Sequence, residues 1–289
     1  MTEFVERSWT TPDGLRLSAR DYAGAAGSAR LPVVCLHGLT RNARDFEDVA
    51  PAFAAAGRRV LAFDVRGRGL SAYDPQPMNY VLPTYVGDMI GWVRALGIER
   101  AVFVGTSMGG LITLLLAAQA PQLVAAAVLN DIGPEIASEG LARISAYTGE
   151  VPQIESWADA VAYTARINGA AFPAYGPAEW EVFARRLFRE QGGRWALDYD
   201  PEIAAPIKAT PPEQPAPDIW PLFDNLAKDR PLLLVRGVLS DLLATTTRDQ
   251  MSARAPHMRV AEVAGVGHAP TLSEPEATGA LAAFLSEID

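Results

Sequence analysis

The stretch FVGTSMGG, residues 103–110, places Ser107 two residues from a glycine on either side. An apolar run, ERAVFVG, leads into it, and a run with helical character, LITLLLAAQA, follows. A serine at the point where a buried strand turns directly into a helix adopts a sharp turn that lifts its hydroxyl above the sheet. Side chains two positions away would collide there, so Gly105 and Gly109 fit the turn. The pattern favours Ser107 as a nucleophile over an ordinary helix-capping serine.

A serine hydroxyl is a weak nucleophile at neutral pH and needs a base to accept its proton. The chain has three histidines. His268 lies in VAGVGHAPTLSEP, a glycine-rich loop after the last expected strand, and functional groups gather beyond the carboxyl ends of strands in an open parallel sheet. His37 precedes a glycine at an early strand end and is expected to brace its loop, whereas His257 is expected in a surface turn. We therefore expect His268 to be the base.

The base needs a carboxylate that fixes its tautomer and stabilises its charged form. Two aspartates compete for this role, because each follows a strand expected to end at the same edge of the sheet. Asp241 lies in VLSDLLA after RPLLLVRG, and Asp131 ends LVAAAVLND. We expect Asp241 to be the acid, since a serine precedes it and helix-like residues follow it. Asp131 is the alternative acid; otherwise it anchors the first turn of the next segment, because aspartate favours helix starts.

A tetrahedral intermediate also needs hydrogen-bond donors for its oxyanion. The backbone N–H of Met108 is one candidate, because the helix that begins there points free N–H groups at the site. The second donor is expected from the loop that follows VVCLHG, where the N–H of Leu39 is the candidate. These two groups complete the expected catalytic set.

Apolar strand-like runs alternate with amphipathic helical runs on both sides of Ser107, which is typical of a mostly parallel sheet covered on both faces. Residues 4–22 predict two strands joined by the turn PDG. Further strands are expected at 31–38, 58–64, 99–105, 123–131, 230–237 and 257–263, and helices at 42–57, 85–97, 108–121 and 274–288. The alternation stops after Asp131. Residues 132–229 predict an inserted helical cap rich in aromatic residues, and 1–131 with 230–289 predict the core domain.

These motifs together give the chain a resemblance to a known family. The pieces HGLT, DVRGRGLS, GTSMGG, RGVLSD and GVGHAP, in that order, resemble those of α/β-hydrolase-fold enzymes, and the similarity covers most of the chain. The resemblance implies the α/β-hydrolase fold and the triad order Ser107, Asp241, His268. It also implies that Arg66 and Arg68 are structural. The cap-bearing subgroup that it resembles contains small esterases, enol-lactonases and carbon–carbon bond hydrolases.

Composition and missing motifs exclude several other classes of function. The net charge of −9 argues against nucleic acid and anionic membrane surfaces as partners. The longest apolar run is too short to span a bilayer, and the N-terminus lacks a signal-peptide core, so an intracellular, cytoplasmic protein is expected. The single cysteine, Cys35, is expected in a buried strand. The sequence lacks GxxxxGK, HExxH and CxxC, so we expect neither a metal nor an organic cofactor.

The expected function is hydrolysis of a carboxylic ester of a small or medium apolar substrate through an acyl-enzyme. Carbon–carbon bond hydrolysis of a β-diketone-like substrate and lactone opening stay open, because the same triad serves all three reactions. A catalytically silent binding protein on this fold is the alternative from another class. Serine at position 107 argues against dehalogenases and epoxide hydrolases, which use aspartate there. The sequence leaves open whether the chain forms a homo-oligomer.

Overall fold

The computed structural model describes residues 3–211 and 217–288. Its centre is an eight-stranded sheet with the order β1-β2-β4-β3-β5-β6-β9-β10. β2 runs antiparallel to both of its neighbours, and all neighbouring pairs from β4 to β10 are parallel. The strands are β1 (Phe4–Thr10), β2 (Arg16–Tyr22), β3 (Val33–Leu36), β4 (Val60–Asp64), β5 (Ala101–Thr106), β6 (Val124–Asn130), β9 (Leu232–Gly237) and β10 (Arg259–Val263).

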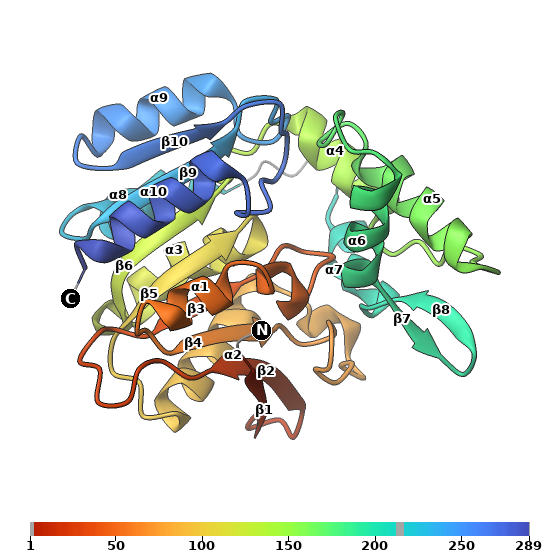
Figure 1. Cartoon of the computed structure of the whole chain (residues 1–289), viewed down its shortest axis with the longest axis horizontal. Helices are drawn as coiled ribbons and strands as arrows, with labels where there is room; N and C mark the ends of the chain where they lie inside the picture. The colour runs from red at the N-terminus through yellow and green to blue at the C-terminus, as the bar shows by residue number, and fades with distance from the viewer. Residues whose placement is uncertain (1–2, 212–216, 289) are drawn as a thin grey trace.

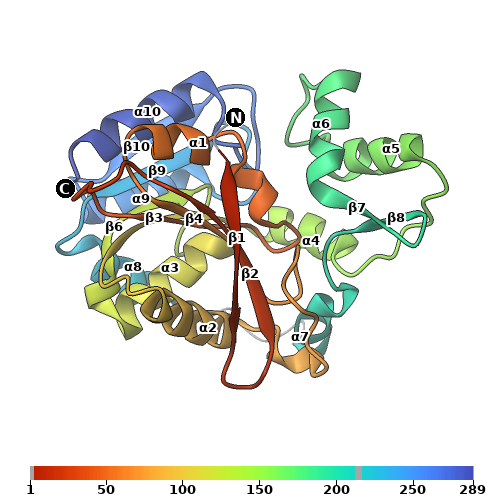
Figure 2. The same ribbon diagram turned by 60° about the horizontal axis from the view of Figure 1, so that its bottom comes forward.

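Helices cover both faces of this sheet (Figure 1). In Figure 2, α1 and α10 lie on one face, and α2, α3 and α8 lie on the other. A further helix, α9, connects β9 to β10. The helices are α1 (Ala50–Ala55), α2 (Leu82–Ala95), α3 (Met108–Gln119), α8 (Trp220–Ala227), α9 (Thr245–Arg254) and α10 (Pro275–Ser286). The mostly parallel, doubly covered sheet that the sequence predicts is confirmed.

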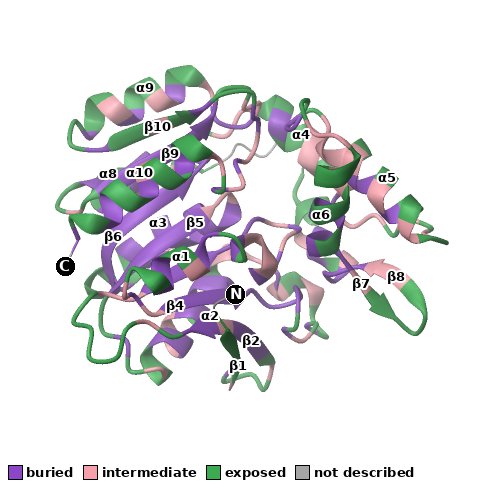
Figure 3. Ribbon diagram, viewed as in Figure 1, coloured by how far each residue is buried: buried purple, intermediate pink, exposed green. Residues whose placement is uncertain are grey.

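The central strands form the core of the molecule, as the buried ribbons in Figure 3 show. Every residue of β3, β4, β6 and β9 is buried. Strands covered on both faces need continuous apolar runs rather than alternating ones, which explains sequences such as VLAFD and LLLVRG. Cys35 of β3 is completely buried, and this burial raises the pKa of its thiol. It is the small core residue that the sequence predicts.

Between β6 and α8 the chain leaves the sheet and builds a separate group of elements, which we call the insertion, residues 138–209 (Figure 1). Ser156 caps the N-terminus of α5 through a capping box with Asp159, and Pro177 is the first residue of α6. A short hairpin that was not predicted from the sequence follows α6. The elements are α4 (Ser138–Tyr147), α5 (Trp157–Asn168), α6 (Pro177–Leu187), β7 (Phe188–Gln191), β8 (Arg194–Leu197) and α7 (Ala205–Ala209).

The last helix of the expected cap, α8, lies with the core. It packs against α3, and the side-chain amide of Asn225 donates to the carbonyl of Ala117 at 3.0 Å. The expected boundary at residue 229 therefore wrongly assigns a core helix to the insertion. The error arises because α8 follows the proline-rich stretch TPPEQPAPD and precedes the strand that resumes the sheet. Its helical pattern does not indicate whether it packs on the core or on the insertion.

The residues directly after the hairpin tie the insertion to the loops that follow β3 and β4. The N–H of Gly69 donates to the carbonyl of Asp198 at 2.9 Å. Arg44 forms an ion pair with the buried carboxylate of Asp198, and the hydroxyl of Tyr80 donates to Asp200 at 2.6 Å. Residues far apart in the sequence are thus joined at one place, and the insertion is fixed beside the carboxyl ends of the strands.

Candidate active site

The backbone at Ser107 has the sharp turn that the sequence predicts. Ser107 lies between β5 and α3 with φ 51° and ψ −115°, a backbone conformation that residues other than glycine rarely adopt. A Cβ at Gly105 would lie 2.4 Å from the carbonyl oxygen of Gly109. A Cβ at Gly109 would lie 2.1 Å from the carbonyl oxygen of Leu36. Glycine is therefore required at both positions, and the turn raises the Ser107 hydroxyl at the end of β5.

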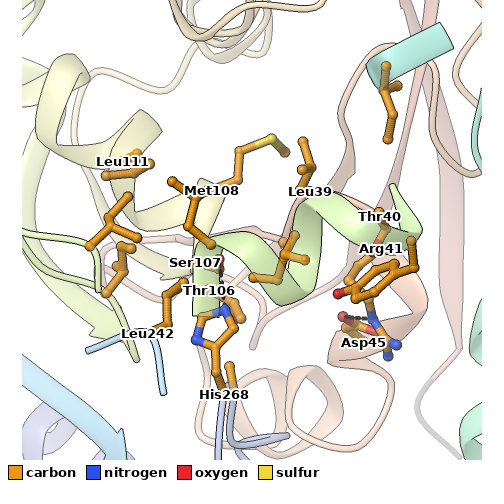
Figure 4. Close-up of a pocket in the computed structure, with 18 of the residues that line it drawn as sticks. Leu39, Thr40, Arg41, Asp45, Thr106, Ser107, Met108, Leu111, Leu242 and His268 are labelled. Atoms are coloured by element: carbon orange, nitrogen blue, oxygen red, sulfur yellow. Dashed lines mark hydrogen bonds and ion pairs between the residues drawn. The ribbon is translucent and has the colours of Figure 1, made fainter. Parts of the chain in front are cut away.

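His268 reaches this hydroxyl from the loop after β10. Its Nε2 lies 3.0 Å from Ser107 Oγ, and its Nδ1 lies 2.8 Å from Asp131 Oδ2. Figure 4 shows the imidazole beside Ser107. A carboxylate only accepts hydrogen bonds, so Nδ1 carries a proton and Nε2 is free to accept one from the serine. Ser107 and His268 are expected to meet from the sequence, and the structure brings them together.

The expectation that Asp241 orients His268 is wrong; the alternative, Asp131, occupies that place. Asp131 directly follows β6, the neighbour of the strand that carries Ser107, and its φ of 53° turns the chain toward His268. Asp241 lies four residues beyond the end of β9, and both of its carboxylate oxygens bind Arg143 of α4, at 2.6 and 2.8 Å. That guanidinium lowers the pKa of the Asp241 carboxyl.

Asp131 is completely buried and accepts three hydrogen bonds. The N–H of Gly237 donates to Oδ1 at 2.9 Å, and the Ser240 hydroxyl lies 2.5 Å from Oδ2, which also faces His268. These donors replace the water that burial removes from a carboxylate. Ser240 was not predicted as a partner of this aspartate, although its place in VLSD, directly before Asp241, is visible in the sequence.

A second missed residue, Asn130, connects the two loops that carry Ser107 and His268. Its side-chain amide donates to Thr106 Oγ1 at 3.0 Å and to the carbonyl of Pro270 at 2.8 Å. The backbone carbonyl of Asn130 accepts a hydrogen bond from the N–H of Ser107 at 3.0 Å. A polar residue at the last position of an otherwise apolar strand is the signal that could have identified it.

The two expected oxyanion donors, Leu39 and Met108, line the same cavity as Ser107. Figure 4 shows both residues near the serine. Met108 is the first residue of α3, where a backbone N–H has no carbonyl within its own helix to bind. Arg68 donates to the carbonyl of Leu39 at 3.0 Å and thereby fixes the loop that carries the second expected donor.

His37 braces that loop, as its sequence context predicts. Its Nε2 accepts the N–H of Val65 at 3.0 Å, so its Nδ1 carries the proton and donates to the carbonyl of Gly38 at 2.7 Å. The ring is completely buried, and this burial lowers its pKa to about 4. His37 is therefore neutral at physiological pH and holds the loop after β3 against the loop after β4.

Ser107 and His268 open into a cavity of about 880 Å³, a size typical of small-molecule sites. Its wall is mostly apolar. The core contributes Leu39, Met108, Leu111 and Leu242, and the insertion contributes Leu141, Ile144, Ile167, Phe172 and Phe183. The charged pair Arg41–Asp45, joined at 2.6 Å, lies on the same wall (Figure 4).

The aromatic residues of the insertion divide between two roles. Phe172 and Phe183 line the cavity and also contact each other, with ring centroids 5.3 Å apart. Tyr175 and Trp180 pack against these rings from behind, at 4.6 and 6.0 Å. The insertion therefore has an aromatic core of its own, and only the inner layer of that core faces the space above Ser107.

Residues 32–275 match the family model described as the alpha/beta hydrolase fold. The chain belongs to the α/β-hydrolase-fold family. Its solved relatives include an α/β hydrolase from Novosphingobium aromaticivorans, with 45% sequence identity, full coverage of both chains and a TM-score of 0.93. The resemblance that the sequence motifs carry is thereby confirmed.

Curated relatives of this α/β hydrolase are named as hydrolases. A 3-hydroxybutyrate-oligomer hydrolase from Cupriavidus necator is 38% identical and covers 92% of this chain and 91% of the relative. A 2-(acetamidomethylene)succinate hydrolase from Mesorhizobium japonicum is 30% identical and covers 84% of this chain and 83% of the relative. The chain is therefore an enzyme of the α/β-hydrolase family.

The two arginines of the DVRGRGLS motif have structural partners in this hydrolase. Arg66 binds the carboxylates of Asp74, at 2.5 Å, and of Asp88, at 2.7 Å. Arg68 is completely buried and donates to Leu39 and to the hydroxyl of Tyr85, the latter at 2.8 Å. Both side chains hold loops in place, as the resemblance implies.

Residues 3–211 and 217–288 form neither a metal-binding cluster nor a membrane-spanning helix. Across these residues, His, Cys, Asp and Glu side chains form no group of three or more that could hold a metal ion. Over the same part of the chain, every helix is too short or too polar to cross a membrane.

Proposed function

We propose that this α/β hydrolase is a serine hydrolase that cleaves carboxylic esters through an acyl-enzyme. The observation that carries the proposal is the chain of hydrogen bonds from Ser107 through His268 to Asp131, at 3.0 and 2.8 Å, at the wall of an apolar cavity. This arrangement supplies a nucleophile, a base and an orienting acid in the roles that a serine triad requires.

The reaction has two halves. Ser107 Oγ bonds to the ester carbonyl carbon while its proton moves to His268 Nε2, and the N–H groups of Leu39 and Met108 bind the oxyanion. His268 then gives the proton to the leaving alcohol as the C–O bond breaks. Water attacks the acyl-enzyme, losing a proton to His268 Nε2, and the acid leaves as Ser107 Oγ regains that proton. Asp131 orients His268 throughout.

The cavity supports short esters with apolar substituents as substrates. Its wall of leucine, isoleucine and phenylalanine side chains stabilises aliphatic groups on either side of the ester by removing them from water. Linear 3-hydroxybutyrate oligomers are esters of this type, and the Cupriavidus relative is named for them. We infer that the insertion acts as a cap that selects the substrate, because it supplies much of the apolar wall.

The experiment is a substrate panel combined with covalent labelling. The panel contains p-nitrophenyl esters of two to eight acyl carbons, 3-hydroxybutyrate dimer and trimer, a lactone and a ring-fission diketone. We expect turnover of the esters, and labelling of Ser107 by an alkyl fluorophosphonate, located by peptide mass spectrometry. The Ser107→Ala variant should lose at least ~10⁴-fold in kcat with an unchanged circular dichroism spectrum. Preferential turnover of the diketone or the lactone would replace the esterase assignment.

A further inference from the structure

We propose that Ser240 is a positioning residue of the active site and that helix α4 of the insertion holds it in place. The inference rests on the proposed function, because Ser240 acts through Asp131 and touches neither the substrate nor Ser107. Its hydroxyl lies 2.5 Å from Asp131 Oδ2, the same oxygen that faces His268.

The direction of the Ser240 proton follows from the other partners of its oxygen. The backbone N–H groups of Leu242 and Leu243 donate to Ser240 Oγ at 3.2 and 3.0 Å. A hydroxyl has two acceptor sites and one proton, so both acceptor sites are used by these N–H groups. The proton is left to point at Asp131. Ser240 is thus a fixed donor to the acid and cannot rotate away without losing all three hydrogen bonds.

This donor matters because Asp131 has no access to water. The carboxylate is completely buried, and its two oxygens accept from Gly237, Ser240 and His268. Gly237 contributes a backbone N–H, which substitution leaves in place, so Ser240 is the only side chain besides His268 that fixes the carboxylate among the described residues. Without it, Oδ2 loses the contact that sets its angle to the imidazole.

The loop that carries Ser240 is held by the insertion rather than by the core alone. The N–H groups of Ala137 and Gly140, at the start of α4, donate to the carbonyls of Leu242 and Asp241 at 2.9 and 3.0 Å. One turn further, Arg143 binds the Asp241 carboxylate through two hydrogen bonds. Residues 137–143 therefore clamp residues 241–242, directly after the serine.

The contact between helix and loop leaves no room for adjustment. A Cβ at Gly140 would lie 2.7 Å from the carbonyl oxygen of Asp241 and 2.8 Å from Cα of Leu242. The close approach explains why a glycine occupies the first turn of a helix, where it lowers helical propensity. We infer that the position of α4 determines the position of Asp131 through Asp241 and Ser240. The position of the insertion thereby sets the hydrogen-bond geometry between Asp131 and His268.

The test is a double-mutant cycle on Ser240→Ala and Arg143→Met, with Ser240→Thr as the conservative variant. Ser240 is partly exposed, and threonine adds a methyl group while it keeps the hydroxyl. We expect Ser240→Ala to lower kcat about tenfold or more with KM within twofold, as for loss of a hydrogen bond to a charged group. Ser240→Thr should recover kcat to within threefold of wild type.

Arg143→Met should lower kcat by about three- to tenfold, and its effect should vanish in the Ser240→Ala background, because both changes interrupt the same path. The matched control is Arg185→Met, which breaks an exposed ion pair of the insertion with Glu181 and should leave kcat unchanged. Melting temperatures are measured for every variant.

Three results would overturn the inference: wild-type kcat in Ser240→Ala, a loss in Ser240→Thr equal to that in Ser240→Ala, or additive effects of the Arg143 and Ser240 changes. Failure of the proposed function is recognised separately. It would appear as activity retained by Ser107→Ala, whereas an inactive Ser107→Ala beside a fully active Ser240→Ala would count against the positioning role alone.

Discussion

The side-chain amide of Asn130 donates to the carbonyl of Pro270 across 2.8 Å, two residues beyond His268. The same amide also binds Thr106, the residue before Ser107. One completely buried side chain thus sets the distance between the loop of the proposed nucleophile and the loop of the proposed base.

We expect Asn130→Ala to lower both kcat and stability. Loss of the amide leaves the buried Pro270 carbonyl without this donor, at a cost of about 1–3 kcal/mol, and frees the loop of His268. The prediction is at least tenfold lower kcat on a p-nitrophenyl ester and a lower melting temperature. Asn225→Ala is the control, because Asn225 also donates from its amide to a buried backbone carbonyl, that of Ala117, but contacts neither loop. A kcat loss as large in Asn225→Ala would show that the effect is merely one of stability.

Substitution of Asp131 should lower kcat far more than substitution of Asp241. Asp131→Asn should cost at least ~10³-fold in kcat, since the amide no longer holds the imidazole in its productive tautomer; a serine protease loses about 10⁴-fold on the corresponding change. Asp241→Asn weakens the pair with Arg143 and should cost less than about tenfold. Both variants are compared on one ester after circular dichroism has verified folding. An inactive Asp241→Asn beside an active Asp131→Asn would reverse the assignment of the acid.

These aspartates also show where sequence reasoning reaches its limit. The contact between Ser107 and His268 could be predicted because each residue is marked by its own neighbours: glycines at the sharp turn, and a glycine-rich loop after the last strand. Asp131 and Asp241 both follow strands that end at one edge, so local pattern treats them alike. The choice depends on a backbone torsion at Asp131 and on Arg143, which lies 98 residues from Asp241 in sequence.

For the fold as well, features with a local sequence pattern could be predicted and features without one could not. The alternation of apolar runs and amphipathic helices predicts the sheet and its layers, because burial on both faces leaves a periodic signal. The β7–β8 hairpin is two four-residue strands in an aromatic-rich segment, too short for a reliable alternation. Ser240 escaped notice for a related reason, since its partner Asp131 lies 109 residues away in sequence.

Gly109, beside the sharp turn at Ser107, should be far less replaceable than a glycine in another helix. Gly109→Ala places a Cβ 2.1 Å from the Leu36 carbonyl oxygen, so β3 and α3 must move apart. We expect low soluble yield or a melting temperature lower by many degrees. Gly279→Ala in α10 meets no atom within 4 Å and should be neutral or stabilising by up to about 1 kcal/mol. Equal melting temperatures for the two variants would contradict the tight turn.

His37 gives a prediction for the pH dependence of stability. Burial lowers its pKa to about 4 from an ordinary value of 6.5, so the unfolded chain takes up a proton at higher pH than the folded chain does. The contribution of neutral His37 is fully present above about pH 6.5 and is lost as the pH falls toward 4.

The measurement compares urea unfolding of wild type and His37→Gln from pH 4 to 7. Glutamine keeps an amide donor and an acceptor but does not titrate, so the wild type should lose stability relative to the variant as the pH falls. Asp64, whose pKa burial raises to about 6, changes stability in the opposite sense over part of this range. It is present in both proteins, so its contribution cancels in the comparison. A difference between the two proteins that does not vary with pH would contradict a neutral, buried His37.

The burial of Cys35 has a practical consequence for spectroscopy. The thiolate is the form that reacts with maleimides and disulfide reagents, and a buried thiol with a raised pKa supplies almost none of it. The native chain should therefore remain unlabelled, with no need to remove its cysteine. Cysteines introduced at the exposed Val182 of α6 and Val5 of β1 would then carry a dye pair or spin labels. The distance between the labels would report directly whether the insertion changes its position when an ester enters the cavity.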